Sequence, residues 1–268
     1  MKSIVIIIGG MADTPEFCEG GRTPMMEADI PAIRELARQG ETGTYFPVKD
    51  SVLSPQHALF QLFGYDPGKT LPSDTELADI ALDPFFPQPD TTRKLFVLPG
   101  LSGHGAMVSP SLTARALGKL AFLEASEFYT PGSTMEEALD IVASETIRKS
   151  KELDFVTVYV DYPVKASLDG DFEEKKYLLE TIDSLLITPV ADYVWHHMDY
   201  VRLVVSAGFT VSSSLRRYIQ APVPFLVYHN TDELDNKISF DEVHAGKGSL
   251  ESNNSPQFIL RDIMESYL

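Results

Sequence analysis

The chain has 268 residues, a length that suits one large α/β domain with a well-buried core better than two small domains. Its 39 aspartate and glutamate residues outnumber its 22 lysine and arginine residues, and the net charge of −17 argues against binding to nucleic acid phosphates or to anionic membrane surfaces. The single cysteine, Cys18, excludes an internal disulfide and a cysteine-based zinc site and is typical of the reducing cytoplasm.

Short runs of β-branched residues bounded by turn residues predict strands that are buried on both faces. The first, residues 3–8, is far too short for a signal-peptide core or a membrane span, and it ends at Gly9 and Gly10. The other predicted strands are, in chain order, residues 43–48, 155–160, 201–206 and 224–227.

Helical patterns with start and stop signals lie between and after these strands. The predicted helices are residues 31–39, 111–121, 135–150, 172–186 and 256–267. Asp169 and Asp171 are expected to cap the fourth of these helices rather than to hold a calcium ion, because no complete calcium-binding loop surrounds them. The alternation of strand and helix predicts a single α/β domain over residues 1–268, with a mostly parallel sheet sandwiched between helices.

One proline-rich segment breaks this alternation. Residues 81–100 place Pro84, Pro87, Pro89 and Pro99 among aromatic residues, which excludes a regular helix. A loop or an edge segment is expected there.

Four stretches carry recognisable motifs in a fixed order. They are residues 4–43, which contain "GGMADTP" and "GGRTPMMEADIPAIRELARQG", residues 53–67, which end in "LFGYDP", residues 154–183, which contain "LDGDFEEKK", and residues 201–228, with a weaker continuation through residues 240–251. Their order and spacing resemble the archaeal-type, cofactor-independent (2,3-bisphosphoglycerate-independent) phosphoglycerate mutases of the alkaline phosphatase superfamily. The resemblance implies an alkaline phosphatase-like core. Family members carry an inserted domain after the "GYDP" motif, and here only the loop at about residues 81–100 stands in its place.

The resemblance also implies a chemistry. Enzymes of this family move a phosphoryl group through a phosphoserine, with two divalent metal ions held by carboxylates, imidazoles and the nucleophile's own oxygen. Most of the positions that match the family's ligands carry other residue types, namely Gly9, Pro55 (beside Ser54), Val164, Leu168, Gly208, Phe209 and Tyr218, while Asp13 and residues 169–173 keep the family pattern. Glycine, valine, leucine and phenylalanine offer no side-chain ligand to a divalent ion. We therefore expect no metal centre, no cofactor and no catalysis of the family's reaction, and instead a binding or regulatory protein.

Several polar residues are left as candidates for a ligand pocket or a relocated site. The candidate pocket residues are Gly9, Asp13, Ser54, Asp161, Lys165 and Tyr218. Ser54 and His57 are three residues apart and are candidates for a nucleophilic pair, although Ser54 suits a helix N-cap equally well. Asp161 lies at the end of a predicted strand, and whether its side chain lines a cavity stays open. Lys165 pairs with Asp161, binds an anion or is solvated.

Three functions stay open at this point. The first is the inactive, mutase-like protein that binds a small anionic ligand or a protein partner, as a monomer or a homo-oligomer. The second is an enzyme that still processes a phosphorylated small molecule at a relocated site around Ser54, His57, Asp13 and Asp161. The third is a structural partner for another protein, through the aromatic segment "DPFFPQP" at residues 83–89.

Overall fold

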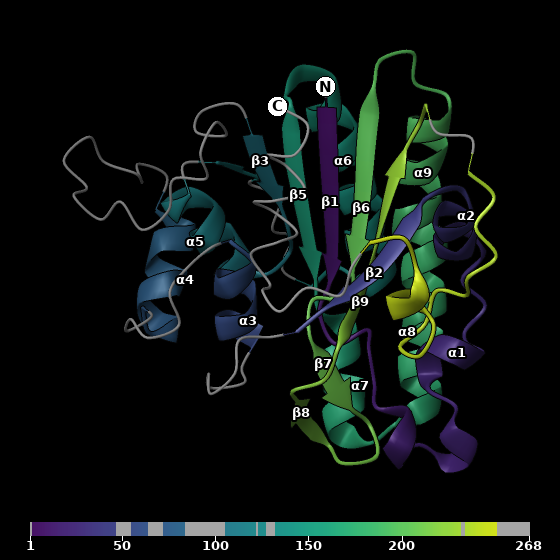
Figure 1. Cartoon of the computed structure of the whole chain (residues 1–268). Coiled ribbons are helices and arrows are strands. Elements are labelled where there is room, and N and C mark those ends of the chain that lie inside the picture. The colour runs from purple at the N-terminus through teal and green to yellow at the C-terminus, as the bar shows by residue number, and fades with distance from the viewer. Residues whose placement is uncertain are drawn as a thin grey trace.

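A twisted, mostly parallel sheet forms the centre of the protein. The structure is a computed structural model that describes residues 2–46, 55–63, 72–83, 105–121, 123–126, 132–231 and 234–250. Within these residues the sheet has seven strands in the order β2, β9, β6, β1, β5, β3, β4 (Figure 1). The strands are β1 (Lys2–Ile8), β2 (Glu41–Tyr45), β3 (Gly105–Val108), β4 (Glu124–Ala125), β5 (Phe155–Val160), β6 (Val201–Ser206) and β9 (Val223–His229). Because β9 runs antiparallel to both β6 and β2 while the other pairings are parallel, the predicted α/β fold with a mostly parallel sheet is confirmed.

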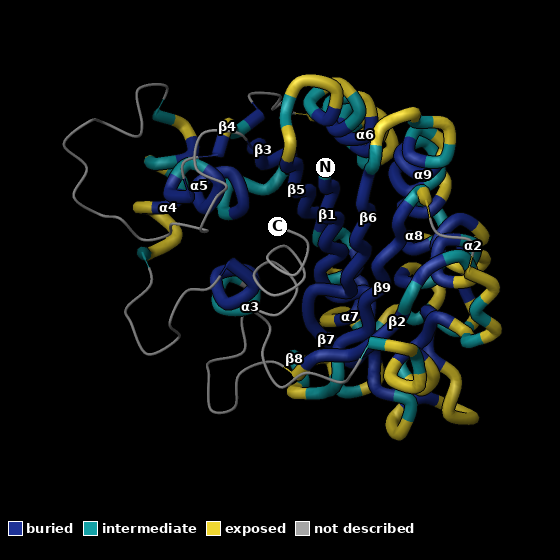
Figure 2. Tube along the Cα trace, turned by 45° about the horizontal axis from the view of Figure 1, so that its top comes forward, coloured by how far each residue is buried: buried dark blue, intermediate teal, exposed yellow. Residues whose placement is uncertain are grey.

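β1 lies at the middle of the sheet and is the most apolar strand. Its Ile4 pairs with Val156 of β5 on one side and with Leu203 of β6 on the other. The side chains from Ile4 to Ile8 are fully buried, and Figure 2 shows β1, β5 and β6 as a continuous buried centre. Burial of such a side chain contributes about 1.5–3 kcal/mol, which explains why a run of five β-branched residues forms this strand.

Helices pack around this sheet in two groups. α2 (Pro31–Gln39) contacts β2 and β9, α6 (Met135–Glu152) contacts β1, β3 and β5, and α9 (Thr188–Trp195) contacts β6. α3 (Pro55–Leu62), α4 (Asp74–Leu82) and α5 (Leu112–Leu120) form a group beside β3 and β4 (Figure 1). The remaining elements are α1 (Pro24–Glu27), α7 (Tyr162–Asp169), α8 (Phe172–Ile182) and the hairpin of β7 (Thr210–Ser212) and β8 (Arg217–Ile219). In the described part of the chain, no helix combines the length and the hydrophobicity needed to cross a bilayer.

Side-chain caps fix several helix starts. Thr134 and Glu137 form a reciprocal capping box at the start of α6. The Asp171 side chain accepts a hydrogen bond from the backbone of Glu174, which confirms the predicted cap of α8 at Asp171. The prediction is wrong for Asp169, which is the last residue of α7 and pairs with Lys165. α2 lacks a cap of its own at Ile30. Its first backbone N–H groups donate instead to Asp183, which lies on a π-helical turn (Asp183–Ile187) between α8 and α9.

The predicted elements match the structure best at the centre. The strands predicted at 155–160 and 201–206 coincide with β5 and β6, and the helix predicted at 31–39 coincides with α2. The helix predicted at 172–186 is wrong in part, since α8 ends at Ile182 and the chain continues as the π-helical turn. The strand predicted at 43–48 is wrong in its bounds, since β2 is Glu41–Tyr45. Ala81 and Leu82 end α4 instead of opening a loop, and residues 84–100 and the helix predicted at 256–267 lie outside the described residues. The described residues also contain elements that were not predicted, namely α1, α3, α4, α7, α9, β3, β4 and the β7–β8 hairpin.

Candidate functional site at the carboxyl edge of the sheet

The carboxyl ends of the central parallel strands meet at one edge of the sheet. β1 ends at Ile8 and is followed by Gly9, β5 ends at Val160 and is followed by Asp161, and β6 ends at Ser206, shortly before Phe209. In Figure 1 α7 and the β7–β8 hairpin lie beyond this edge, at the lower end of the sheet. Ligands of open α/β sheets bind at such an edge, so the sequence-predicted site lies in the place where the fold type favours one.

The space beside Gly9 is filled by two aromatic side chains. A Cβ atom on Gly9 would lie 2.9 Å from Cζ of Phe209 and 3.0 Å from the hydroxyl oxygen of Tyr159. Gly10 has a positive φ of 74°, and a Cβ atom there would lie 2.9 Å from Cγ2 of Val164. Position 9 is therefore restricted to glycine by packing, whereas position 10 is restricted by both its backbone conformation and its packing.

Phe209 is held firmly in this space. It is 4% exposed, and its ring centroid lies 5.8 Å from that of Tyr218. The backbone leading to it is fixed by Tyr45 of β2, whose hydroxyl donates to the carbonyl of Gly208 at 2.6 Å. Among the positions that the resemblance assigns to metal ligands, Phe209 thus packs against Gly9, and Val164 packs against the adjacent Gly10, so apolar side chains fill the space after β1.

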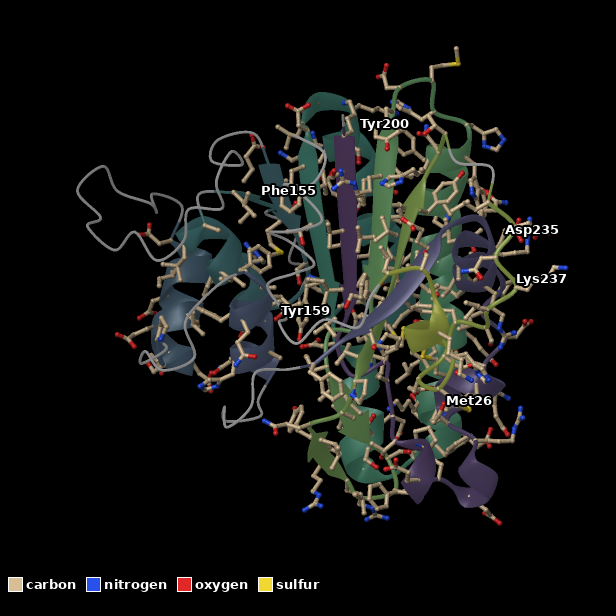
Figure 3. All side chains as sticks on the ribbon, in the orientation of Figure 1. Met26, Phe155, Tyr159, Tyr200, Asp235 and Lys237 are labelled. Carbon is tan, nitrogen blue, oxygen red and sulfur yellow. The ribbon has the colours of Figure 1, made fainter. Side chains whose placement is uncertain are left out.

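A carboxyl group and two phenols border this cluster. The Tyr159 hydroxyl donates to Oδ2 of Asp161 at 3.3 Å, and Figure 3 places Tyr159 at the lower end of β5, opposite Phe155. Burial raises the pKa of Asp161, and the Tyr159 hydrogen bond offsets part of this rise. Burial and the nearby charge of Asp161 raise the pKa of Tyr218 as well. The phenols therefore stay neutral at physiological pH and serve as hydrogen-bonding groups.

Asp13 does not line an open pocket but forms a buried ion pair. Its Oδ2 lies 3.0 Å from Nζ of Lys175 in α8, and both side chains are fully buried. The same oxygen accepts hydrogen bonds from the backbone and the hydroxyl of Ser213, and Oδ1 accepts one from the backbone of Thr14. Burial raises the pKa of Asp13, but the Lys175 ammonium and these hydrogen bonds outweigh it, and the pKa is lowered overall. The carboxylate is thus fully engaged in holding the chain after β1 against α8 and the β7 strand.

Asp161 and Lys165 lie instead in a surface pocket of about 700 Å³. Its walls come from α7, α8 and the start of α6, and its lining residues include Glu136, Asp161, Tyr162, Lys165, Asp169, Asp171, Glu174 and Tyr177. The Lys165 side chain is 86% exposed and forms an ion pair with Asp169, not with Asp161. Lys165 is therefore solvated, which was one of its three predicted roles, and Asp161 does line a cavity.

The remaining candidates are less closely connected to this edge. Ser54 lies outside the described residues, so its roles as nucleophile or N-cap stay predictions. His57 is partly buried on α3, where burial lowers its pKa. Leu168 is 37% exposed on α7 and is separate from the buried cluster of Gly9 and Phe209.

The residues at this edge do not fit the two metal ions that the resemblance implies. Ring carbons of Phe209, a methyl group of Val164 and the neutral phenol of Tyr159 surround the glycines after β1. Divalent ions require several charged oxygen or imidazole ligands at short range. In the part of the chain that the structure describes, no three histidine, cysteine, aspartate or glutamate side chains are grouped closely enough to hold an ion.

Two features of this region could not be read from the sequence. Tyr159 lies between two valines in a buried strand, so the sequence makes it look like a core residue. In the structure its hydroxyl donates to Asp161. Lys175 lies in a run of charged residues, "EEKK", which is typical of a solvated helix face. The only sequence signal for the burial of Lys175 is the 3.6-residue period, which places it on the same side of α8 as the buried Leu178 and Leu179.

Comparison with known sequences finds archaeal phosphoglycerate mutases among the relatives. No family model matches the chain. It is 27% identical over 148 residues to 2,3-bisphosphoglycerate-independent phosphoglycerate mutase 1 of Methanocaldococcus jannaschii, and 26% identical over 149 residues to the mutase of Methanosarcina acetivorans. Each alignment covers 54% of this chain but only 35% and 37% of the relatives, so the matched region spans little more than a third of their length.

Comparison with solved structures agrees on the fold. The PH0037 protein from Pyrococcus horikoshii aligns with a TM-score of 0.77 at 20% identity, covering 98% of this chain and 96% of that one. The cofactor-independent phosphoglycerate mutase from Thermoplasma acidophilum aligns with a TM-score of 0.62 at 16% identity, covering 99% and 100%, and alkaline phosphatase from the Antarctic bacterium TAB5 with 0.52 at 9%, covering 98% and 96%. The chain is thus a homologue of archaeal cofactor-independent phosphoglycerate mutases, and its fold resembles that of such a mutase and of an alkaline phosphatase.

Proposed function

We propose that this chain is a phosphoglycerate mutase-like protein that does not carry out two-metal phosphoryl transfer and that acts as a binding or regulatory protein. The observation that supports this most strongly is the packing of Phe209 and Tyr159 against Gly9. A metal ligand would have to project from the strand end at the place where these two side chains already lie. Substitution of one position would leave a weakened site, whereas this packing removes the space itself.

The apolar replacements are also consistent physically. Carboxylates gathered at a strand end repel each other and are costly to bury unless cations neutralise them. Valine at position 164 and phenylalanine at position 209 avoid that cost and bury apolar surface at the same edge. A protein that binds no metal here gains stability from these residue types, while a metal enzyme would lose its ions.

The pocket beside Asp161 is the proposed binding place. Its lining has the five carboxyl groups of Glu136, Asp161, Asp169, Asp171 and Glu174 against the single ammonium of Lys165. Such a charge balance repels a small anion from these walls, so an anionic ligand would have to keep its charge away from them. A protein partner, self-association into a homo-oligomer and a cytoplasmic location are further proposals.

The alternative function is an enzyme with a relocated site around Ser54. The observation that favours it is the lowered pKa of His57, because a neutral imidazole is the form that acts as a general base. His57 lies in the first turn of α3, three residues after Ser54 in the sequence, which is compatible with a serine and histidine pair.

An activity assay separates these proposals. The chain would be incubated with 3-phosphoglycerate and, separately, with p-nitrophenyl phosphate, in the presence of Mn²⁺ or Mg²⁺ and then with EDTA. The binding or regulatory proposal predicts rates equal to those without protein. Turnover that EDTA abolishes would overturn it. Turnover that survives EDTA but is lost in Ser54→Ala, with phosphoserine found at position 54 by mass spectrometry, would establish the alternative.

A further inference from the structure

A C-terminal segment, residues 234–250, wraps along one side of the protein, and we refer to it as the strap. Near its start Asp235 pairs with Arg38 of α2 at 2.7 Å, and the backbone of Asn236 donates to the carbonyl of Arg38 at 2.6 Å. Figure 3 shows Asp235 and Lys237 on the outer side of the molecule, next to α2. At its end the backbone of Leu250 donates to the carbonyl of Thr42 at 3.2 Å. That carbonyl lies on the edge of β2 that does not face β9, so the strap covers the edge of the sheet.

The middle of the strap is held by one carboxyl group. Oε1 of Glu242 accepts a hydrogen bond from the backbone N–H of Asp13 at 2.8 Å, and Oε2 accepts one from the hydroxyl of Thr23 at 2.8 Å. These partners lie after β1 and at the start of α1, so Glu242 connects the strap to the N-terminal part of the chain.

The titratable groups that face Glu242 do not neutralise it. They are Asp13 after β1, Lys175 of α8 and Cys18, which lies between β1 and α1. On the strap itself, His244 pairs with Asp241 at 2.8 Å. Lys175 donates to the carbonyls of Ala12 and Val211 and to Asp13, which uses its three protons. With Asp13 and Glu242 both ionised, the buried group would therefore carry one uncompensated negative charge. Burial raises the pKa of Glu242 to about 7, although the Asp13 backbone, Thr23 and Lys175 offset part of the rise.

The hydrogen-bond geometry accommodates the neutral acid. The Thr23 hydroxyl already accepts from the backbone of Met26, and its second lone pair can accept from a protonated Glu242. The backbone N–H of Asp13 still donates to the other oxygen. Protonation therefore removes the buried charge without the loss of either contact.

We propose that Glu242 is a proton-operated latch, whose neutral form holds the strap closed and whose ionised form loosens it and uncovers the outer edge of β2. Opening exposes Glu242 to water, where its pKa returns to the ordinary value of 4.5. Between about pH 4.5 and about pH 7 the closed strap keeps the proton and the open strap loses it. Opening is therefore favoured by about tenfold for each pH unit in this window, and the effect is level above it.

Hydrogen exchange followed by mass spectrometry on the full chain tests the latch. Protection factors of peptides from residues 240–250 would be measured from about pH 5 to about pH 8 and corrected for the intrinsic exchange rate at each pH. The wild type is expected to lose protection by about tenfold per unit up to about pH 7. Glu242→Gln, a neutral isostere, is expected to show a flat profile.

Two matched controls lie in the same strap. Asp235→Asn removes an exposed carboxylate, and His244→Gln removes the one imidazole of the strap, so both should keep the wild-type slope. A flat wild-type profile, a Glu242→Gln profile that keeps the slope, or a His244→Gln profile that loses it would each overturn the proposal. If Glu242→Gln fails to fold, the other two profiles still test the proposal. A wild-type slope that His244→Gln keeps supports the latch, and a flat wild-type profile or a slope that His244→Gln loses overturns it.

Discussion

Position 9 is a glycine because its neighbours leave no room for any other residue. A methyl group there would lie 2.9 Å from Phe209 and 3.0 Å from the Tyr159 hydroxyl. We expect Gly9→Ala to lower the free energy of unfolding by about 1–3 kcal/mol through overpacking. Phe209→Ala should cost about 3–5 kcal/mol through the cavity it creates.

The double variant Gly9→Ala/Phe209→Ala tests whether these two residues fill the same space. Because the new methyl group occupies part of the cavity, the double variant should lose at least about 1 kcal/mol less than the sum of the single variants. Urea denaturation of the four proteins measures this coupling. Strict additivity would show that Phe209 does not pack against position 9.

The buried pair of Asp13 and Lys175 gives a second prediction at the residue scale. Asp13→Ala removes the carboxylate that accepts directly from the buried Lys175 ammonium and leaves it with two carbonyl acceptors, which should cost about 3–5 kcal/mol in a denaturation experiment. The matched control is Asp169→Ala, which breaks the exposed pair with Lys165 and should cost under about 1 kcal/mol. Similar losses in the two variants would contradict a structural role for Asp13.

At the scale of elements, α2 depends on a cap that comes from another helix. Asp183 accepts hydrogen bonds from the backbone N–H groups of Ala32 and Ile33 at 3.1 and 2.9 Å, and it is 1% exposed. Asp183→Ala should lower the free energy of unfolding by about 2 kcal/mol, because two buried donors lose their acceptor. Asp192→Ala, an exposed position on α9, is the control and should change stability by under about 0.5 kcal/mol. Equal effects would show that the cap contributes nothing.

The central elements were predictable because their residues are buried on every side. β1, β5 and β6 are continuous apolar runs, and this pattern has few alternatives once turn residues bound it. The π-helical turn was not predictable, because its role as a cap for α2 depends on residues about 150 positions away. The β7–β8 hairpin was not predictable either, because it is short and its turn has Arg216 at a positive φ. Sequence patterns do not associate arginine with such a turn.

The candidate site was predictable only in part. The resemblance placed Gly9, Val164 and Phe209 together, and the structure packs Phe209 against Gly9 and Val164 against the adjacent Gly10. Asp13 was expected to line a pocket, but the structure uses it to neutralise Lys175. Residue type alone does not distinguish a carboxylate that faces a cavity from one that pairs with a lysine 162 positions away, because this depends on how α8 packs against the end of β1.

At the scale of the whole molecule, Glu242 should make global stability depend on pH. A carboxyl group whose pKa is raised from 4.5 to about 7 in the folded state adds no penalty below about pH 4.5, and stability is lost as the pH rises towards about 7. Glu242→Gln lacks this loss, so its stability relative to the wild type should increase by on the order of 1–3 kcal/mol across that window. Urea denaturation of the wild type and Glu242→Gln at several pH values measures this difference. The pKa of Asp183 is also raised, but Asp183 changes the stability of both proteins equally and cancels in the difference. A difference that is constant with pH would contradict the uncompensated charge of ionised Glu242 in the folded protein.

The central claim for the whole molecule is that aromatic and aliphatic groups occupy the strand ends where the resemblance implies metal ligands. Thermal unfolding with increasing Mn²⁺ tests this claim most directly, because an ion that binds only the folded protein stabilises it by RT ln(1 + [ion]/Kd) and so raises its melting temperature. We predict that the melting temperature stays unchanged from no added ion to about 1 mM Mn²⁺, on a scale where a site of micromolar affinity would stabilise the fold by roughly 4 kcal/mol. A melting temperature that rises with ion concentration, that EDTA returns to its starting value and that rises equally in Asp161→Asn would place ions at this edge and contradict the account.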